Sequence, residues 1–106
     1  DGSEQTGWTV HYFHIGEEGR IPAGTQVAAG DVIGYASCEG GVTNGTHFHI
    51  ARRYNGVWIG AGGSIPFNFE GWIASSYGTV YDGTLTKDGK TVEAYNGRAD
   101  INEIGN

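Results

Sequence analysis

Two histidines spaced two residues apart, His47 and His49, are the residues of this sequence best suited to chemistry. They lie in the stretch "GTHFHIA", which reads as a β-strand. On a strand, residues i and i+2 point to the same side, so both imidazoles project together while Phe48 and Ile50 point into the opposite layer. Imidazole is a common zinc ligand, and zinc prefers four tetrahedral ligands. The pair alone is a weak prediction of a metal site.

A third histidine, His14, strengthens that prediction. It lies near the end of residues 8–15, "WTVHYFHI", where bulky side chains alternate along a predicted strand. The residues that share its face are Trp8, Val10 and Tyr12. Because both faces carry bulky residues, we expect a central strand covered on both sides. If this strand neighbours that of His47 and His49, three of the four histidines can meet; alternatively, His14 only caps an aromatic face.

Three motifs together resemble the lysostaphin/LasA-type zinc metallopeptidases, β-sheet enzymes that cut peptide cross-links in bacterial cell walls. They are "TVHYFHI", "VAAGDVIGYAS" and "GVTNGTHFHIARRYNGVWI", and the resemblance covers about residues 7–82. It implies that His49 is a zinc ligand and that His47 is the catalytic histidine that handles the attacking water. It also implies that His14 stabilises the oxyanion or assists the water. Zinc lowers the pKa of its water, and a neutral imidazole nearby can take a proton. His11 matches nothing in the pattern, and we expect a surface or packing role for it.

The same family holds its zinc with a further His and Asp from an earlier His-x-x-x-Asp motif. No histidine of this sequence is followed four residues later by an aspartate. By resemblance the chain starts in the middle of the family's domain, so we expect a truncation at the N-terminus and one zinc ligand of three. The resemblance implies Zn²⁺ in an intact parent domain, with little or none bound to this chain alone. A substitute site completed by His47, Cys38, Glu39 or a water is the alternative.

Composition argues against several classes of function. The chain has 12 acidic and 6 basic residues among 106, and a formal charge of −6. Only Arg52 and Arg53 are adjacent, so we expect no nucleic-acid partner and no adhesion to an anionic membrane. No apolar run approaches the roughly 20 residues that span a bilayer, and no signal peptide is visible. The family works outside the cytoplasm, so the resemblance implies an extracellular or cell-envelope location.

Glycine-punctuated Thr, Val, Tyr and Trp clusters predict an all-β chain, most economically one domain over residues 1–106. We expect a twisted antiparallel β-sheet of the lysostaphin/LasA type. Asn55-Gly56 predicts a hairpin turn. Residues 83–106 are expected to form a terminal hairpin, turned at Asp88-Gly89, and a polar tail. Residues 16–37 read as short strands around tight turns.

Other single residues allow competing interpretations. The one cysteine, Cys38, is expected to be a small buried thiol or to form a disulfide between chains. One of Arg52 and Arg53 is expected to be solvated and the other paired. Residues 63–75 read as a loop packed by aromatic side chains. The aromatic residues from Trp58 to Trp72 either cover the sheet or line a groove for glycan or peptide.

These features predict part of a zinc-dependent endopeptidase domain that acts on cell-wall peptide cross-links and is inactive as this chain alone. A non-catalytic extracellular structural or filament subunit, completed by strand pairing between chains, is the alternative. A non-catalytic binding module is a third hypothesis. Truncation would leave open sheet edges, which pair readily with other chains. We therefore expect a partner: the missing N-terminal half of the domain, or copies of the same chain, with cell-wall peptide as a further candidate.

Overall fold

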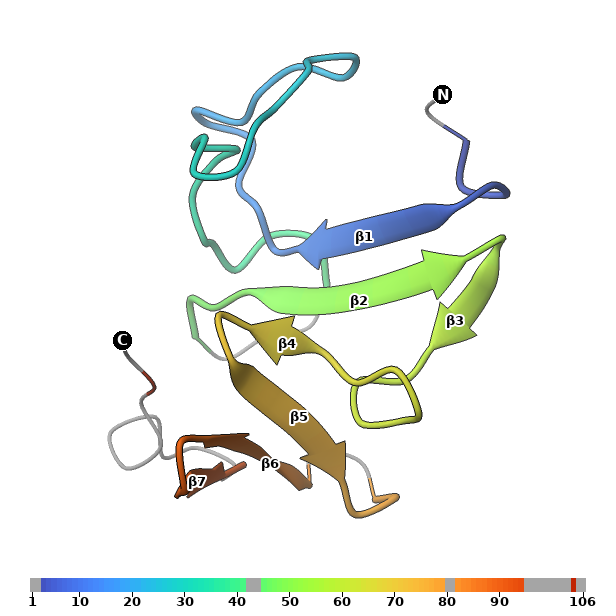
Figure 1. Cartoon of the computed structure of the whole chain (residues 1–106). Helices are drawn as coiled ribbons and strands as arrows, with labels where there is room; N and C mark the ends of the chain where they lie inside the picture. The colour runs from blue at the N-terminus through green and yellow to red at the C-terminus, as the bar shows by residue number, and fades with distance from the viewer. Residues whose placement is uncertain (1–2, 42–44, 80–81, 95–103, 105–106) are drawn as a thin grey trace. The chain divides into compact units, whose positions relative to one another are not determined.

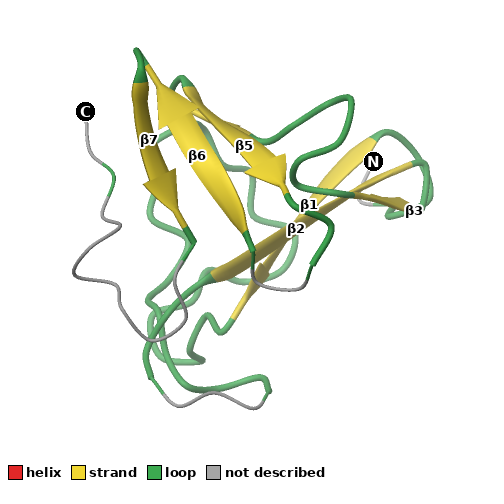
Figure 2. Ribbon diagram, turned by 90° about the horizontal axis from the view of Figure 1, so that it is seen from below, coloured by secondary structure: helices red, strands yellow, loops and turns green. Residues whose placement is uncertain are grey.

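A computed structural model describes residues 3–41, 45–79, 82–94 and 104. In these residues the chain forms strands and loops and no helix (Figures 1 and 2). The strands are β1 (Trp8–Phe13), β2 (His49–Tyr54), β3 (Val57–Ile59), β4 (Asn68–Phe69), β5 (Trp72–Ser76), β6 (Gly83–Lys87) and β7 (Lys90–Glu93). The pairs β1–β2, β4–β5, β5–β6 and β6–β7 are antiparallel. The predicted all-β antiparallel fold is confirmed, while the polar tail, apart from residue 104, lies outside the described residues.

The chain divides into two compact units, residues 1–58 and residues 59–106. The first unit holds a three-stranded sheet of order β1-β2-β3, whose last residue, Ile59, opens the second unit. The second holds a four-stranded sheet of order β4-β5-β6-β7. The prediction that residues 1–106 form a single domain is not tested by this division and stays a prediction.

In the first unit, β1 and β2 pair along their whole length, from Trp8 opposite Tyr54 to Phe13 opposite His49 (Figure 1). The predicted turn between β2 and β3 is confirmed. Its residues Asn55 and Gly56 have φ of 48° and 80°, the left-handed conformations that Asn-Gly hairpins require. In the described sheet β1 is an edge strand, so the prediction of a central strand is wrong. Alternating bulky residues indicate which side chains share a face of the strand, but not how many strands pair with it.

One face of β1 and β2 stays largely exposed. Its large side chains are Trp8, Val10, Tyr12, Phe48 and Tyr54, each between 45% and 52% exposed. Below Trp8 the guanidinium carbon of Arg52 lies 5.4 Å from the indole ring, and Arg52 is only 8% exposed. Arg53 Nη1 donates to Glu4 Oε2 at 3.1 Å. Arg53 is therefore the paired arginine that we expected. The prediction that the other arginine is solvated is wrong, because Arg52 is buried with its guanidinium near the Trp8 ring.

Between β1 and β2 the chain forms turns joined by isolated bridges, and the prediction of short strands over residues 16–37 is wrong. The bridges pair Ile15 with Ala36 and Ser37 with His47. Glycines with positive φ recur at positions 19, 24, 30 and 34. Such closely spaced turn residues leave too little extended chain between them for a ladder.

The second unit begins with a hairpin where we expected a loop. Glu70 and Gly71, with φ of 52° and 96°, turn β4 into β5. The rings of Phe67 and Phe69 stack with centroids 5.1 Å apart. Trp72 is the buried apolar residue of the described chain, at 7% exposure. The aromatic side chains were thus correctly predicted to pack this segment, but they do so from a hairpin.

The last two strands form the hairpin that the sequence predicts. β6 and β7 pair from Thr84 opposite Glu93 to Lys87 opposite Lys90. Asp88 and Gly89 make the turn, with φ of 50° and 78°. The strands β5, β6 and β7 lie side by side and twist together (Figure 2).

Candidate functional site

His14 lies just beyond the end of β1 in a left-handed backbone conformation, with φ of 66°. Its ring is 4.5 Å from the ring of His47, centroid to centroid, with the planes 45° apart. The register places His49 opposite Phe13, and thus on the other face of the sheet from Tyr12. By alternation His47 lies on the same side as His49, so the His14 ring that contacts it is also on that side. The prediction that His14 shares the face of Tyr12 is therefore wrong. Positive φ ends the alternation and turns the ring to His47.

Both rings are oriented by backbone carbonyls. His14 Nδ1 lies 2.8 Å from the carbonyl oxygen of Glu39, and His47 Nδ1 lies 2.8 Å from that of Gly45. A carbonyl oxygen only accepts, so Nδ1 must carry the proton in each ring. In the neutral form, Nε2 of each ring is then the nitrogen with the lone pair, the state required of a base or a metal ligand.

His49 occupies the first position of β2 and lies apart from this hydrogen-bonded arrangement. Its ring is exposed and lies 4.9 Å from the ring of Phe13, its partner in the sheet. Farther along the same face, the ring of His11 lies 5.1 Å from that of Trp58 and 6.1 Å from that of Phe13. His11 thus packs among aromatic side chains. The structure brings His14 and His47 together and places His49 on the strand that follows; the roles predicted for all three stay predictions.

Comparison with known proteins bears on this region. Protease LasA of Pseudomonas aeruginosa strain UCBPP-PA14 is 35% identical to the chain over 66 residues, and Protease LasA of strain PAO1 is 32% identical over 66 residues. The matched region is of the LasA peptidase type. The resemblance read from the three motifs is confirmed, and this part of the chain has a peptidase-family origin.

The match is partial on both sides. It covers 56% of this chain, and the chain spans 16% of the length of each of these LasA relatives. No family model and no solved structure matches the chain. No helix long and apolar enough to cross a membrane occurs in the described residues. The peptidase origin does not favour the alternative of a filament subunit, and the predicted strand pairing with a partner stays a prediction.

The LasA-type region does not by itself supply a zinc site. Within residues 3–41, 45–79, 82–94 and 104, no three His, Cys, Asp or Glu side chains are grouped so that they could hold a metal. Glu39, a predicted substitute ligand, instead accepts a hydrogen bond from the Glu17 amide at Oε2, over 3.0 Å. The thiol of Cys38 is exposed, 3.9 Å from Thr46 Oγ1, so the prediction of a buried thiol is wrong. The described residues therefore do not by themselves complete a catalytic zinc centre.

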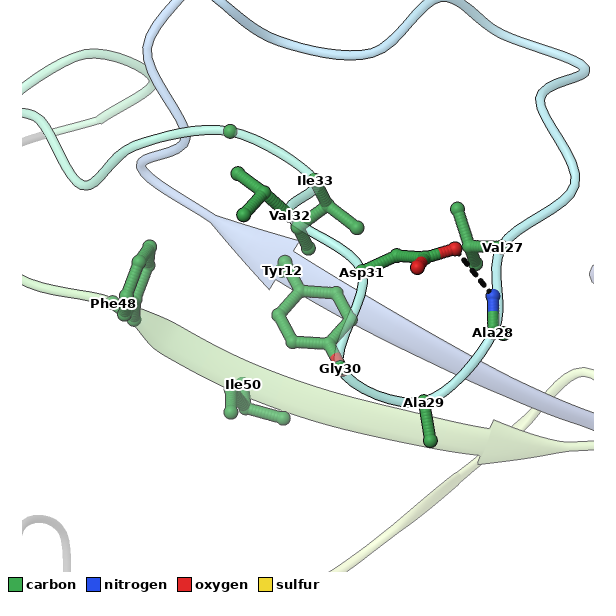
Figure 3. A pocket seen from close by; sticks show the side chains of 11 residues that line it. Tyr12, Val27, Ala28, Ala29, Gly30, Asp31, Val32, Ile33, Phe48 and Ile50 are labelled. Carbon is green, nitrogen blue, oxygen red and sulfur yellow. Dashed lines mark hydrogen bonds between the residues drawn. The ribbon is translucent and has the colours of Figure 1, made fainter.

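A cavity of about 590 Å³ lies on the opposite side of β2 from the histidines. Tyr12 and Ile50 line it from the strands, Phe48 lines it from just before β2, and the loop from Val27 to Gly34 lines another side (Figure 3). Asp31 Oδ2 accepts from the Ala28 amide at 2.8 Å and shapes this loop. The orientation of Phe48 and Ile50 agrees with the predicted alternation, and the cavity carries none of the candidate site residues.

No role was predicted for Ser37 from the sequence, although it is the last residue of the motif "VAAGDVIGYAS". In the structure its amide and its hydroxyl both donate to the carbonyl oxygen of His14, at 2.8 and 3.0 Å. Serine is common in turns, so the residue type alone carried no signal. Its place in the site is shown by these hydrogen bonds and by its bridge to His47, contacts with residues that are not its neighbours in sequence.

Proposed function

We propose that this chain forms part of a zinc-dependent endopeptidase domain that cleaves peptide cross-links of bacterial cell walls, outside the cytoplasm. The peptidase origin of the matched region supports a hydrolase. The cell-wall substrate and the extracellular location rest on the resemblance of the three histidine-bearing and glycine-bearing motifs to the lysostaphin/LasA-type enzymes.

The observation that carries the proposal is the pair of rings of His14 and His47, 4.5 Å apart, each with Nδ1 held by a backbone carbonyl. In peptide hydrolysis a base must take a proton from the attacking water, and a donor must stabilise the oxyanion that forms. His47, with Nε2 as the acceptor nitrogen of its neutral ring, would take the proton. His14, whose ring lies beside that of His47, would accept a hydrogen bond from the water at its neutral Nε2 or, once protonated, would donate from Nε2 to the oxyanion.

His49 would be this chain's one zinc ligand, and zinc would supply Lewis-acid polarisation of the scissile carbonyl. The remaining ligands would come from outside the described residues, either from another segment of the gene product or from a partner chain. Because the described residues offer no complete metal site, we expect no hydrolysis by the 106-residue chain on its own.

The test uses the full-length gene product, loaded with zinc and incubated with purified peptidoglycan. Release of soluble peptide fragments is followed by chromatography. We expect His47→Ala to lower the rate by about 100-fold or more, the usual contribution of a general base. His49→Ala is expected to abolish the rate together with the bound zinc, measured by elemental analysis.

His11→Phe is the matched control, because it removes an imidazole and keeps a ring against Trp58 and Phe13. His11 Nε2 is buried without a hydrogen-bond partner in the described part of the chain, so the change leaves no polar group unsatisfied there. The control should hydrolyse at nearly the parent rate. A His47→Ala protein as active as the control would refute the proposal.

A further inference from the structure

Ser37 touches both halves of the histidine pair. Its hydroxyl donates to the carbonyl oxygen of His14 at 3.0 Å and accepts from the Glu39 amide at 3.0 Å. Its amide donates to the same His14 carbonyl at 2.8 Å. Its backbone also forms the antiparallel bridge to His47. The partly buried side chain of Ser37 therefore connects the backbones of His14 and Glu39, while its own backbone is bridged to His47.

The link to Glu39 matters for the ring of His14. The Glu39 carbonyl is the group that accepts from His14 Nδ1, at 2.8 Å. The amide of Glu39 donates to the Ser37 hydroxyl, and its carboxylate accepts from the Glu17 amide at 3.0 Å, so both ends of this residue are held in the loop. A Cβ at Gly41 would lie 3.2 Å from Cε1 of His14, so the loop also approaches the ring closely. The tautomer of His14 thus depends on where Ser37 holds the loop.

We infer that Ser37 is a positioning residue: through its hydroxyl it holds the loop that places the Glu39 carbonyl against Nδ1 of His14, and so keeps Nε2 of that ring as the acceptor nitrogen. The inference rests on the proposed function only for its effect on catalysis. The orientation and tautomer of His14 are properties of the chain itself and can be measured without any activity.

The first experiment measures the ring nitrogens of His14 by ¹H–¹⁵N NMR of the 106-residue chain at a pH of about 8.5, above the usual titration range of histidine. We expect the parent chain to carry its proton on Nδ1. Ser37→Ala should shift the ring to a mixture of tautomers, because the Glu39 carbonyl is no longer held. Ser37→Thr, which keeps a hydroxyl, should restore the Nδ1–H form.

Ser76→Ala is the matched control. Its hydroxyl likewise accepts from the amide two residues later, Gly78, at 3.0 Å, but in the second unit. It should leave the His14 spectrum unchanged. If Ser37→Ala does not fold, Ser37→Cys takes its place, because a thiol is a weak donor and acceptor and should give an intermediate mixture. A Ser37 variant that keeps the parent tautomer, or a parent chain with the proton on Nε2, overturns the inference.

A second experiment separates this inference from the proposed function. In the full-length gene product, Ser37→Ala should lower kcat by up to about 100-fold with little change in KM, since a misplaced group acts on the chemical step. Ser37→Thr should recover the rate. If the gene product hydrolyses no peptide while the tautomers behave as expected, the proposed function fails and the positioning role of Ser37 stands. If hydrolysis proceeds and Ser37→Ala changes KM alone, the positioning role in catalysis is refuted.

Discussion

The imidazole rings of His14 and His47 lie 4.5 Å apart because His14 adopts a left-handed backbone conformation immediately after β1. For a residue with a side chain this conformation costs about 1–2 kcal/mol. The two hydrogen bonds that Ser37 donates to the His14 carbonyl offset that cost. The pair is therefore built by strain at one residue and hydrogen bonds from another.

This strain predicts an order of stability for two substitutions at His14. Both His14→Ala and His14→Gly remove the ring and its bond to the Glu39 carbonyl. Only glycine adopts a φ of 66° without steric cost. We expect His14→Gly to unfold at a higher urea concentration than His14→Ala, by about 1 kcal/mol in the free energy of unfolding. Equal stabilities, or a more stable alanine variant, would show that the left-handed conformation is absent in solution.

The lack of a grouped metal site predicts weak zinc binding by the 106-residue chain. His49 is its one family ligand, and the described residues offer no set of three. A single imidazole gives far less than the affinity of a full coordination shell. Calorimetric titration with zinc should show no one-to-one binding tighter than about 1 μM. A tight site that disappears in His47→Ala would instead indicate that the second histidine of the pair acts as a substitute ligand.

Local features of the fold followed from the sequence. Asn55-Gly56 and Asp88-Gly89 predicted their hairpins correctly, since the conformation of a two-residue turn depends on the residues within it. The strand predicted around His47 and His49 is present from His49 onward as β2, whereas His47 forms an isolated bridge before it. The LasA-type resemblance was confirmed over part of the chain.

The remaining features depend on contacts between distant residues. Alternation placed His14 with Tyr12, because no residue type announces a left-handed conformation at a histidine. It also could not reveal that β1 lies at an edge of the described sheet, or that Arg52 is buried beneath Trp8. Each of these is set by what lies across from the residue in space, which a pattern along the chain does not record.

Trp72 should carry a large share of the stability of the second unit. It is 7% exposed, whereas Tyr77 in the same unit is 58% exposed. Trp72→Ala leaves a cavity and should lower the free energy of unfolding by about 3–5 kcal/mol, and Tyr77→Ala by less than about 1 kcal/mol. Urea unfolding followed by far-UV circular dichroism measures both. Similar losses in the two variants would mean that Trp72 is not a core residue.

Two adjacent glycines provide a sharper test of how the second unit packs. A Cβ at Gly62 would overlap the backbone amide of Ser76 and come within 2.8 Å of the Ser75 carbonyl carbon, whereas a Cβ at Gly63 would meet nothing within 4 Å. These backbone atoms belong to β5 and are paired with β6, from Ser75 opposite Thr84. They cannot yield without disturbing the ladder, so Gly62→Ala should cost about 1–3 kcal/mol of unfolding free energy.

Gly63→Ala is the matched control for that change, since neither glycine has the positive φ at which alanine is strained. It should be neutral, or stabilise by about 0.4–1 kcal/mol by restricting the unfolded chain. The midpoints of urea unfolding of the two variants decide the matter. Two equally stable alanine variants would show that Gly62 does not pack closely against the backbone of β5.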